Sequence, residues 1–291
     1  MKKIGLTLGG GGARGFAHIA ILEVFDELGI QPAEISGTSI GAVLGALYAS
    51  GKSAAEIYEM ISPMFIPATR KSSIKDIFRT KDNFKFLELF DPHLSLRPNG
   101  LIKGEKLLSF LYEELGVSTF EELKIPLRAV AADFWRNQQV VFDSGELLPA
   151  IRASMAIPYV FTPIRVHDRV LVDGGLVNNV PLDLLSSTCD IRIAVDVMGE
   201  SSKPKDKIPN PIEAIFHTYE VMMSTIADEK LASNPVDIFL RVPLTDAELL
   251  DFHKTDHIYK QALNVKAEFK RKLSELIEPE PSFMDRLRRK S

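Results

Sequence analysis

The sequence predicts an α/β fold in which a mostly parallel sheet carries helices on both faces. Three observations support this. Short apolar runs alternate with helix-like segments, glycine-rich turns follow the first two runs, and the segments after those turns repeat apolar residues at helical spacing. Such alternation is typical of three-layer proteins, which bind ligands at the carboxyl ends of their strands.

Composition and charge narrow the class of protein. The chain has 291 residues, of which 45% are hydrophobic and 25% charged, enough to bury a sizeable core. A formal net charge of -4 leaves no basic excess for nucleic acid, so we expect no nucleic-acid partner. A single cysteine, Cys189, excludes an internal disulfide, and the longest uncharged apolar stretch, Ile40–Ala49, is too short to cross a bilayer. We therefore expect a cytoplasmic protein.

The first two strand-to-helix units are the clearest elements. A strand at Ile4–Thr7 is followed by the loop LGGGGARG and by an amphipathic helix, which Gly29 ends as a C-terminal cap. The next unit, AEISGTSIGAVLGALYASG, indicates a short strand, a sharp turn at Ser39 and an apolar helix that ends near Gly51.

The rest of the chain continues the alternation. We expect one main core over residues 1–200, with a lid-like insertion at about 61–101 where prolines and aromatic residues are scattered. Residues 201–291 form a C-terminal extension on the same domain, with a flexible tail at 279–291. Further strands are predicted at Leu127–Ala132, Val140–Phe142, Arg169–Val172, Arg192–Val197 and Ile238–Val242, and helices at Glu105–Leu115, Pro149–Ala156, Pro211–Leu231 and Ala247–Leu276.

The glycine loop is open to two interpretations. Gly10, Gly12 and Gly15 satisfy the dinucleotide pattern G-x-G-x-x-G between a strand and a helix. That pattern also needs an acidic residue after the second strand to hold a ribose, whereas Glu34 precedes the apolar part of that strand. A phosphate-binding P-loop would need a lysine that this loop lacks. The alternative is that the loop holds an oxyanion formed during a reaction.

The second turn carries a sharper signal. Gly37-Thr38-Ser39-Ile40-Gly41 is G-x-S-x-G between a strand and a helix, the arrangement called a nucleophile elbow. Its glycines allow the strand and helix to pass in contact, and its serine stands at a helix N-terminus, where developing negative charge is favoured. A serine that only caps the helix is the alternative.

A serine nucleophile needs a base, and Asp173 is the best candidate. Asp173 ends an apolar strand in RVLVDGGLVNNVPL and precedes two glycines. A carboxylate is a weak base, so it must touch the serine hydroxyl in a dry site, with backbone amides of the glycine loop aimed at the oxyanion. None of the six histidines stands in a loop that recommends it for a triad; they are His18, His93, His167, His217, His253 and His257.

These segments together resemble the patatin-like phospholipases, in the style of their short bacterial members. The resemblance covers roughly residues 1–197 and is strongest at four segments in the family's chain order. They are Gly10-Gly11-Gly12-Ala13-Arg14-Gly15, Gly37-Thr38-Ser39-Ile40-Gly41, the proline-containing stretch ASMAIPYVFTP, and Asp173-Gly174-Gly175.

The resemblance implies a patatin-like fold and a Ser39-Asp173 dyad that cleaves lipid acyl esters, of the phospholipase A or lysophospholipase type. It assigns the oxyanion hole to Gly10, Gly11 and Gly12, and gives Arg14 a bracing role. It implies no metal and no cofactor. The remaining motif residues, expected to support the site, are Gly15, Gly37, Gly41, Gly174 and Gly175.

Two other functions stay open at this point: a dinucleotide-binding protein that uses the glycine loop, and a non-catalytic signalling module on the same scaffold. The tail FMDRLRRKS mixes apolar and basic residues, which raises the hypothesis of peripheral contact with an anionic membrane. The sequence identifies neither the natural substrate nor the oligomeric state.

Overall fold

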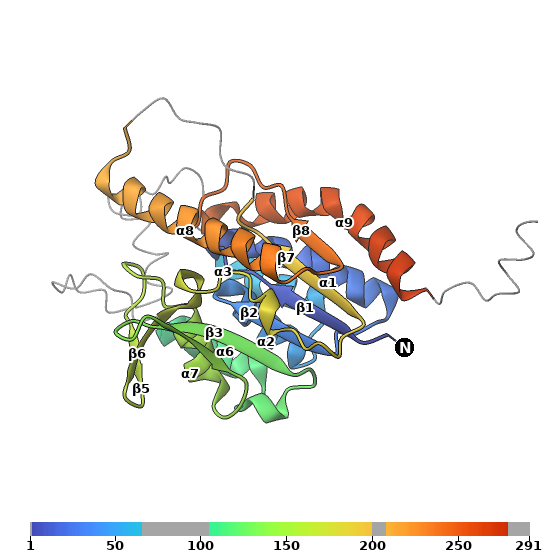
Figure 1. Ribbon diagram of the computed structural model, residues 1–291, viewed down its shortest axis with the longest axis horizontal. Helices are drawn as coiled ribbons and strands as arrows, with labels where there is room; N and C mark the ends of the chain where they lie inside the picture. The colour runs from blue at the N-terminus through green and yellow to red at the C-terminus, as the bar shows by residue number, and fades with distance from the viewer. Residues whose placement is uncertain (1, 66–104, 200–207, 279–291) are drawn as a thin grey trace, which may run out of the picture.

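A computed structural model describes residues 2–65, 105–199 and 208–278 of the chain. It shows a central sheet with helices packed on both sides (Figure 1). The predicted three-layer α/β/α class is therefore confirmed.

The middle of the sheet is parallel. Strand β1 (Ile4–Leu8) lies between β2 (Glu34–Thr38) and β7 (Ile191–Asp196), and both pair with it in parallel. The parallel order continues with β3 (Leu127–Asp133) beyond β2 and β8 (Ile238–Arg241) beyond β7. The carboxyl ends of these strands therefore meet along one edge of the sheet.

The side of the sheet around β3 is antiparallel. Strands β4 (Gln138–Phe142) and β6 (Arg169–Asp173) both pair antiparallel with β3, and β5 (Ile164–Val166) pairs with β6. Because β4 pairs with the carboxyl half of β3 on one edge, β2 and β6 must share the other edge. Strand β6 therefore approaches the carboxyl end of β2 head on.

Alternating side chains of β7 show how the two faces are covered. Ile193 and Val195 belong to the main core, which includes helix α1 (Ala17–Leu28), helix α2 (Ile40–Ala49) and helix α9 (Thr255–Ile277). Ala194 points the other way, into a smaller cluster with Ala227 of helix α8 (Pro211–Ser233). The other α-helices of the described ranges are α3 (Ala54–Phe65), α6 (Glu105–Leu115) and α7 (Leu147–Ser154).

Most predicted boundaries lie within two residues of the observed ones, but two differ more. The last helix begins at Thr255 rather than Ala247: residues 247–254 contain a turn and a short 3₁₀ helix at Phe252–Lys254, and the Ala247 and Leu249 carbonyls accept hydrogen bonds from the glycine loop. Helix α3 reaches Phe65, so the start of the predicted insertion is helical. The rest of that insertion and the tail at 279–291 lie outside the described residues. Within the described ranges, no helix is both long and apolar enough to cross a membrane.

Candidate active site

Ser39 stands in a sharp turn between β2 and α2. Its backbone has φ 53° and ψ -126°, a left-handed conformation that side-chain-bearing residues rarely adopt. A Cβ on Gly41 would lie 2.1 Å from the Leu8 carbonyl oxygen, and one on Gly37 would lie 2.7 Å from the Gly41 oxygen. Gly37 is therefore needed for β2 to pass close to α2, and Gly41 for α2 to pass close to β1, as expected of a nucleophile elbow.

Ser154 supports this turn, and the sequence analysis did not single it out. The backbone N–H of Ser39 donates a 2.8 Å hydrogen bond to Ser154 Oγ at the end of α7. Both residues are buried. Ser154 lies in ASMAIPYVFTP, so its motif was found from the sequence although its role was not.

The Asp173 carboxyl is buried, and two hydrogen-bond donors bind the same one of its oxygens. Its Oδ1 accepts hydrogen bonds from the Gly175 N–H at 2.7 Å and from the Tyr219 hydroxyl at 3.0 Å. Oδ2 has no hydrogen bond of regular geometry among the described residues. One carboxylate oxygen is thus held, and the other is left to interact with a further group.

Burial raises the pKa of Asp173 to about 6, because a charge is costly away from water. Hydrogen bonding by the Ser39 hydroxyl, the Gly175 N–H and the Tyr219 hydroxyl opposes this rise in pKa. The structure therefore brings Ser39 and Asp173 together, from positions far apart in the sequence. Tyr219 was not foreseen, because nothing in the pattern of a long helix marks one tyrosine as facing a carboxylate.

The glycine loop lies beside Ser39, and its amides are not equivalent. A Cβ on Gly10 would lie 3.3 Å from Ser39 Cβ and 2.6 Å from Asn179 Oδ1, so a larger residue here would displace the buried Asn179 side chain. The Gly10 N–H already donates to the Asn179 carbonyl at 3.0 Å. Among the described residues, the Gly11 N–H has no hydrogen-bond acceptor. Gly12 is the first residue of a 3₁₀ helix, so its N–H has no acceptor within that helix. Within the described residues, the Gly11 and Gly12 amides are thus unpaired, whereas the Gly10 amide is occupied.

Residues 247–249 and helix α8 contact the glycine loop. Ala13 N–H donates to the Leu249 carbonyl at 2.8 Å, and Arg14 Nε donates to the Ala247 carbonyl at 2.9 Å. The Arg14 guanidinium also lies 3.1 Å from the Glu220 carboxylate of α8. These contacts are consistent with the bracing role expected of Arg14.

Other motif glycines mark close approaches inside the site. A Cβ on Gly15 would lie 2.3 Å from the Ile40 side chain, and one on Gly174 would lie 2.2 Å from the Val130 carbonyl oxygen. A Cβ on Gly175 would lie 2.9 Å from the Tyr219 hydroxyl. These glycines allow the glycine loop, the elbow and the Asp173 turn to pack together.

His18 lies beneath the glycine loop. Its Nε2 donates a 2.8 Å hydrogen bond to the Gly9 carbonyl, and complete burial lowers the pKa of the imidazole to about 4. The ring is therefore neutral near pH 7, and its hydrogen bond supports the backbone at the start of the loop. No set of three metal-ligating side chains gathers within the described residues.

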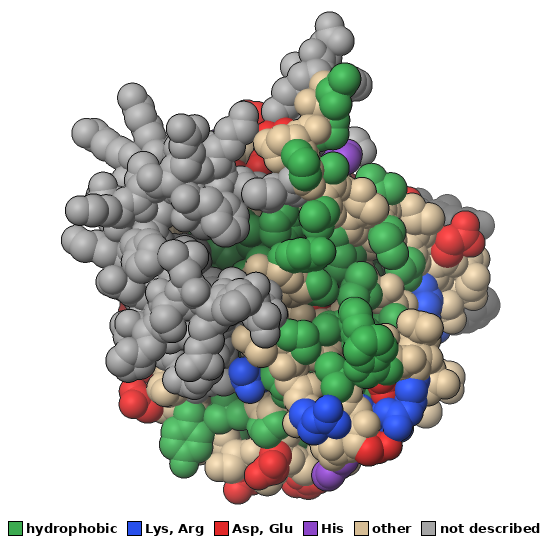
Figure 2. Space-filling model, turned by 90° about the vertical axis from the view of Figure 1, so that its left-hand side faces the viewer, with side chains coloured by type: hydrophobic (Ala, Val, Ile, Leu, Met, Phe, Trp, Pro, Cys, Tyr) green, Lys and Arg blue, Asp and Glu red, His purple; other side chains and the backbone are tan. Residues whose placement is uncertain are grey.

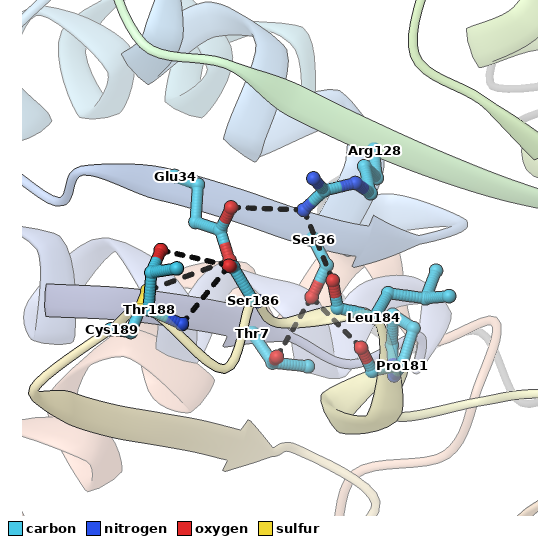
Figure 3. Close-up of polar contacts among 9 residues, drawn as sticks. All are labelled: Thr7, Glu34, Ser36, Arg128, Pro181, Leu184, Ser186, Thr188 and Cys189. Carbon is cyan, nitrogen blue, oxygen red and sulfur yellow. Dashed lines mark hydrogen bonds and ion pairs between the residues drawn. The ribbon is translucent and has the colours of Figure 1, made fainter.

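Glu34, considered above as a ribose ligand, lies at the opposite end of β2 from the elbow. Its carboxylate accepts hydrogen bonds from Arg128 at 3.0 Å and from the Ser186 backbone N–H (Figure 3). Cys189 Sγ lies 3.5 Å away, and burial together with this carboxylate raises the pKa of the thiol to about 11. Glu34 therefore holds the chain after Asp173 against the sheet and does not face the glycine loop.

Further along the same strands, Thr7 and Ser36 extend this polar cluster. Their hydroxyl oxygens are 2.8 Å apart, and Ser36 Oγ donates to the Pro181 carbonyl at 2.9 Å (Figure 3). Nearer the site, Thr38 Oγ1 donates to the Asn178 carbonyl at 2.7 Å. The segment VNNVP is thus hydrogen-bonded to β2 immediately after the Asp173 turn.

Comparison with known proteins agrees with this architecture. The family model for patatin-like phospholipases matches residues 6–186, and the chain belongs to that family. An uncharacterized NTE family protein of Mycobacterium tuberculosis is 34% identical over 210 residues, which make up 72% of this chain and 53% of that protein. A lysophospholipase of Neurospora crassa is 28% identical in an alignment of 297 positions, which covers 94% of this chain but 18% of that protein.

The chain spans about half the length of the mycobacterial relatives that it matches. Among solved structures, VipD from Legionella pneumophila superposes with a TM-score of 0.52 at 13% identity, covering 93% of this chain and 66% of VipD. This likeness shows a shared fold.

Proposed function

We propose that this protein is a serine hydrolase of lipid acyl esters, with Ser39 as nucleophile and Asp173 as its base. The observation that carries the proposal is the Asp173 carboxyl: it is buried against the elbow serine, with Oδ1 held by two donors and Oδ2 without a regular hydrogen bond among the described residues. Membership of the patatin-like phospholipase family supports the same chemistry.

The reaction follows from these positions. Ser39 Oγ attacks the ester carbonyl carbon while its proton passes to Asp173 Oδ2, and the resulting oxyanion accepts hydrogen bonds from the Gly11 and Gly12 amides. Collapse of this intermediate breaks the ester bond, and the leaving alcohol takes the proton from Asp173. Water then attacks the acyl-Ser39 ester, giving its proton to the same carboxylate; collapse releases the fatty acid and returns that proton to Ser39.

The substrate class is a lipid ester, and within it we propose a phospholipid or lysophospholipid. The support is the family assignment together with the relatives, of which the fungal proteins are named lysophospholipases. Release of fatty acid from a lysophosphatidylcholine, compared with the diacyl lipid, measures this preference. If the protein hydrolyses a short-chain ester but neither of these lipids, the lipid substrate is excluded and the proposed dyad is not.

Labelling by a fluorophosphonate tests the dyad most directly. We expect the wild-type protein to be labelled at Ser39, as mapped by mass spectrometry, and to hydrolyse p-nitrophenyl butyrate. Ser39→Ala should lose both properties, and Asp173→Asn should lose turnover. Ser50→Ala is the matched control, because Ser50 lies at the far end of the same helix and its hydroxyl donates to the Leu47 carbonyl of its own turn. Labelling at another residue, or turnover by Ser39→Ala, would exclude the proposed nucleophile.

The same experiment separates the two other functions. A dinucleotide-binding protein would bind NAD or FAD saturably and leave Ser39 unlabelled. A non-catalytic module would show neither labelling nor hydrolysis, and its partner binding would survive Ser39→Ala. Contacts of the glycine loop with Ala247 and Leu249 favour neither alternative, because the chain itself fills the space beside Gly12.

We also propose peripheral contact with a membrane. Hydrophobic side chains gather on the face shown in Figure 2. Large apolar side chains are exposed close in sequence to the site, at Trp135 after β3, Tyr159 after α7, and Val221 and Met222 after Tyr219. Anionic vesicles should therefore bind the protein, and Trp135→Ala should weaken binding.

Deleting residues 282–291 measures the separate contribution predicted for the basic tail. If the deletion leaves vesicle binding unchanged, the tail has no role in membrane binding. If Trp135→Ala also leaves vesicle binding unchanged, the exposed apolar side chains have no such role either.

A further inference from the structure

Helix α8 reaches the site from a part of the chain that the family model does not match. The match ends at residue 186, whereas α8 spans Pro211–Ser233. Two consecutive residues of this helix contact two separate parts of the site. Tyr219 donates to Asp173, and Glu220 pairs with Arg14 of the glycine loop.

Tyr219 is held in place by apolar packing. It is 9% exposed and belongs to a buried cluster with Phe216 and Met223 of its own helix and with Ile157, Met198 and Leu249 from other segments. Its hydroxyl oxygen lies 3.0 Å from Asp173 Oδ1. Burial and the adjacent carboxylate raise the pKa of Tyr219 well above its usual value, so the phenol stays protonated as a donor.

The two donors on Asp173 act on the same oxygen. The Gly175 N–H and the Tyr219 hydroxyl both bond to Oδ1, which fixes the rotation of the carboxyl group and leaves Oδ2 without a regular hydrogen bond. The Gly175 bond is local to the turn, whereas the Tyr219 bond comes from a separate element. Of these two donors, Tyr219 is the one that links the orientation of the Asp173 carboxyl to the packing of α8.

We propose that Tyr219 is a positioning residue, which orients the Asp173 carboxyl so that its free oxygen receives the proton of Ser39. This inference rests on the proposed function and names a component of the same site. Glu220 extends the role of the helix, because its pairing with Arg14 ties the oxyanion loop to the same turn of α8. The base and the loop thus share one support.

Within the part of the chain that the structure describes, few groups act on the Asp173 carboxyl. They are the Ser39 hydroxyl from the elbow, the Gly175 N–H from its own turn and the Tyr219 hydroxyl from α8, and none of them is charged. The Tyr219 bond stabilises the carboxylate over the acid. Removing the Tyr219 hydroxyl should therefore raise the pH at which Asp173 becomes an effective base.

Tyr219→Phe tests the proposal through the pH dependence of hydrolysis. We expect the acid limb of kcat/KM to move up by about one pH unit, and kcat above that limb to fall about tenfold with little change in KM. The matched control is Tyr48→Phe, which removes a 2.7 Å hydrogen bond to the Asp26 carboxylate, away from the site. The control should leave the pH profile unchanged.

A second variant keeps the size and the hydrogen bond. Replacing Tyr219 by 3,5-difluorotyrosine makes the phenol a stronger donor, and it should move the acid limb down instead of up. An unchanged pH profile in both Tyr219 variants, while Ser39→Ala is inactive, would overturn the positioning role and leave the dyad standing. Activity retained by Ser39→Ala would instead overturn the proposed function itself.

Discussion

Thr38 and Asp173 pair with consecutive residues on one edge of β3. Thr38 lies opposite Val130 in the parallel pairing with β2, and Asp173 lies opposite Ala131 in the antiparallel pairing with β6. The elbow serine follows Thr38 directly. The two strands therefore end head to head, and backbone hydrogen bonding to β3 fixes the distance between the proposed nucleophile and base.

The raised pKa of Asp173 predicts the pH dependence of hydrolysis. A base must be ionised to accept the serine proton, so kcat/KM should fall about tenfold for each pH unit below about 6. A pH series with p-nitrophenyl butyrate, over a range in which the protein stays folded, measures this limb. An acid limb near pH 4 would show that the base is a carboxyl without a raised pKa.

Asp173→Asn should stabilise the folded protein at neutral pH although it abolishes turnover. Because the folded pKa is about 6 and the ordinary value is 3.8, the folded state binds more protons between these pH values, and wild-type stability falls as pH rises through them. The stability of the variant relative to wild type should therefore grow by up to about 3 kcal/mol between pH 4 and pH 8. Urea unfolding at both pH values measures the difference, and a constant difference would contradict the prediction.

His18→Gln should show the opposite pH dependence. The folded pKa of His18 is lowered to about 4 from an ordinary 6.5, so the unfolded state binds more protons in this window and wild-type stability falls as pH falls. The glutamine amide can still donate to the Gly9 carbonyl but does not titrate. The variant should thus gain stability relative to wild type between pH 7 and pH 4, by up to about 3 kcal/mol. If the difference in unfolding free energy between the variant and wild type is the same at all pH values, His18 is not buried as a neutral ring.

Ser154→Ala should weaken both the fold and the proposed elbow. The Ser39 N–H would lose its acceptor while still buried, at a cost of about 1 to 3 kcal/mol in the free energy of unfolding. Because that bond supports a strained backbone, the rate of fluorophosphonate labelling at Ser39 should also fall. Ser50→Ala, which orphans no backbone amide, should leave labelling unchanged. Equal labelling rates in the two variants would remove Ser154 from the support of the elbow.

Local sequence was sufficient to predict the elements around the elbow. The glycines at 37 and 41 and the apolar helix after them indicate a strand, a strained turn and a helix, because each signal acts over a few neighbouring residues. The prediction of a helix from Ala247 was wrong for the same reason. Residues 247–254 have helical periodicity, but Arg14 and Ala13 of the glycine loop take the carbonyls of Ala247 and Leu249 as acceptors.

The sequence by itself determined the three-layer class, the elbow at Ser39, and the candidates for base and oxyanion loop, since turn chemistry and hydrophobic periodicity are local properties. Only the tertiary structure decided that Asp173 is joined by Tyr219, that Ser154 holds the elbow, and that Gly11 and Gly12 rather than Gly10 keep open amides. These are contacts between distant segments. They depend on the register of β6 on β3 and on the docking of α8, which no local pattern encodes.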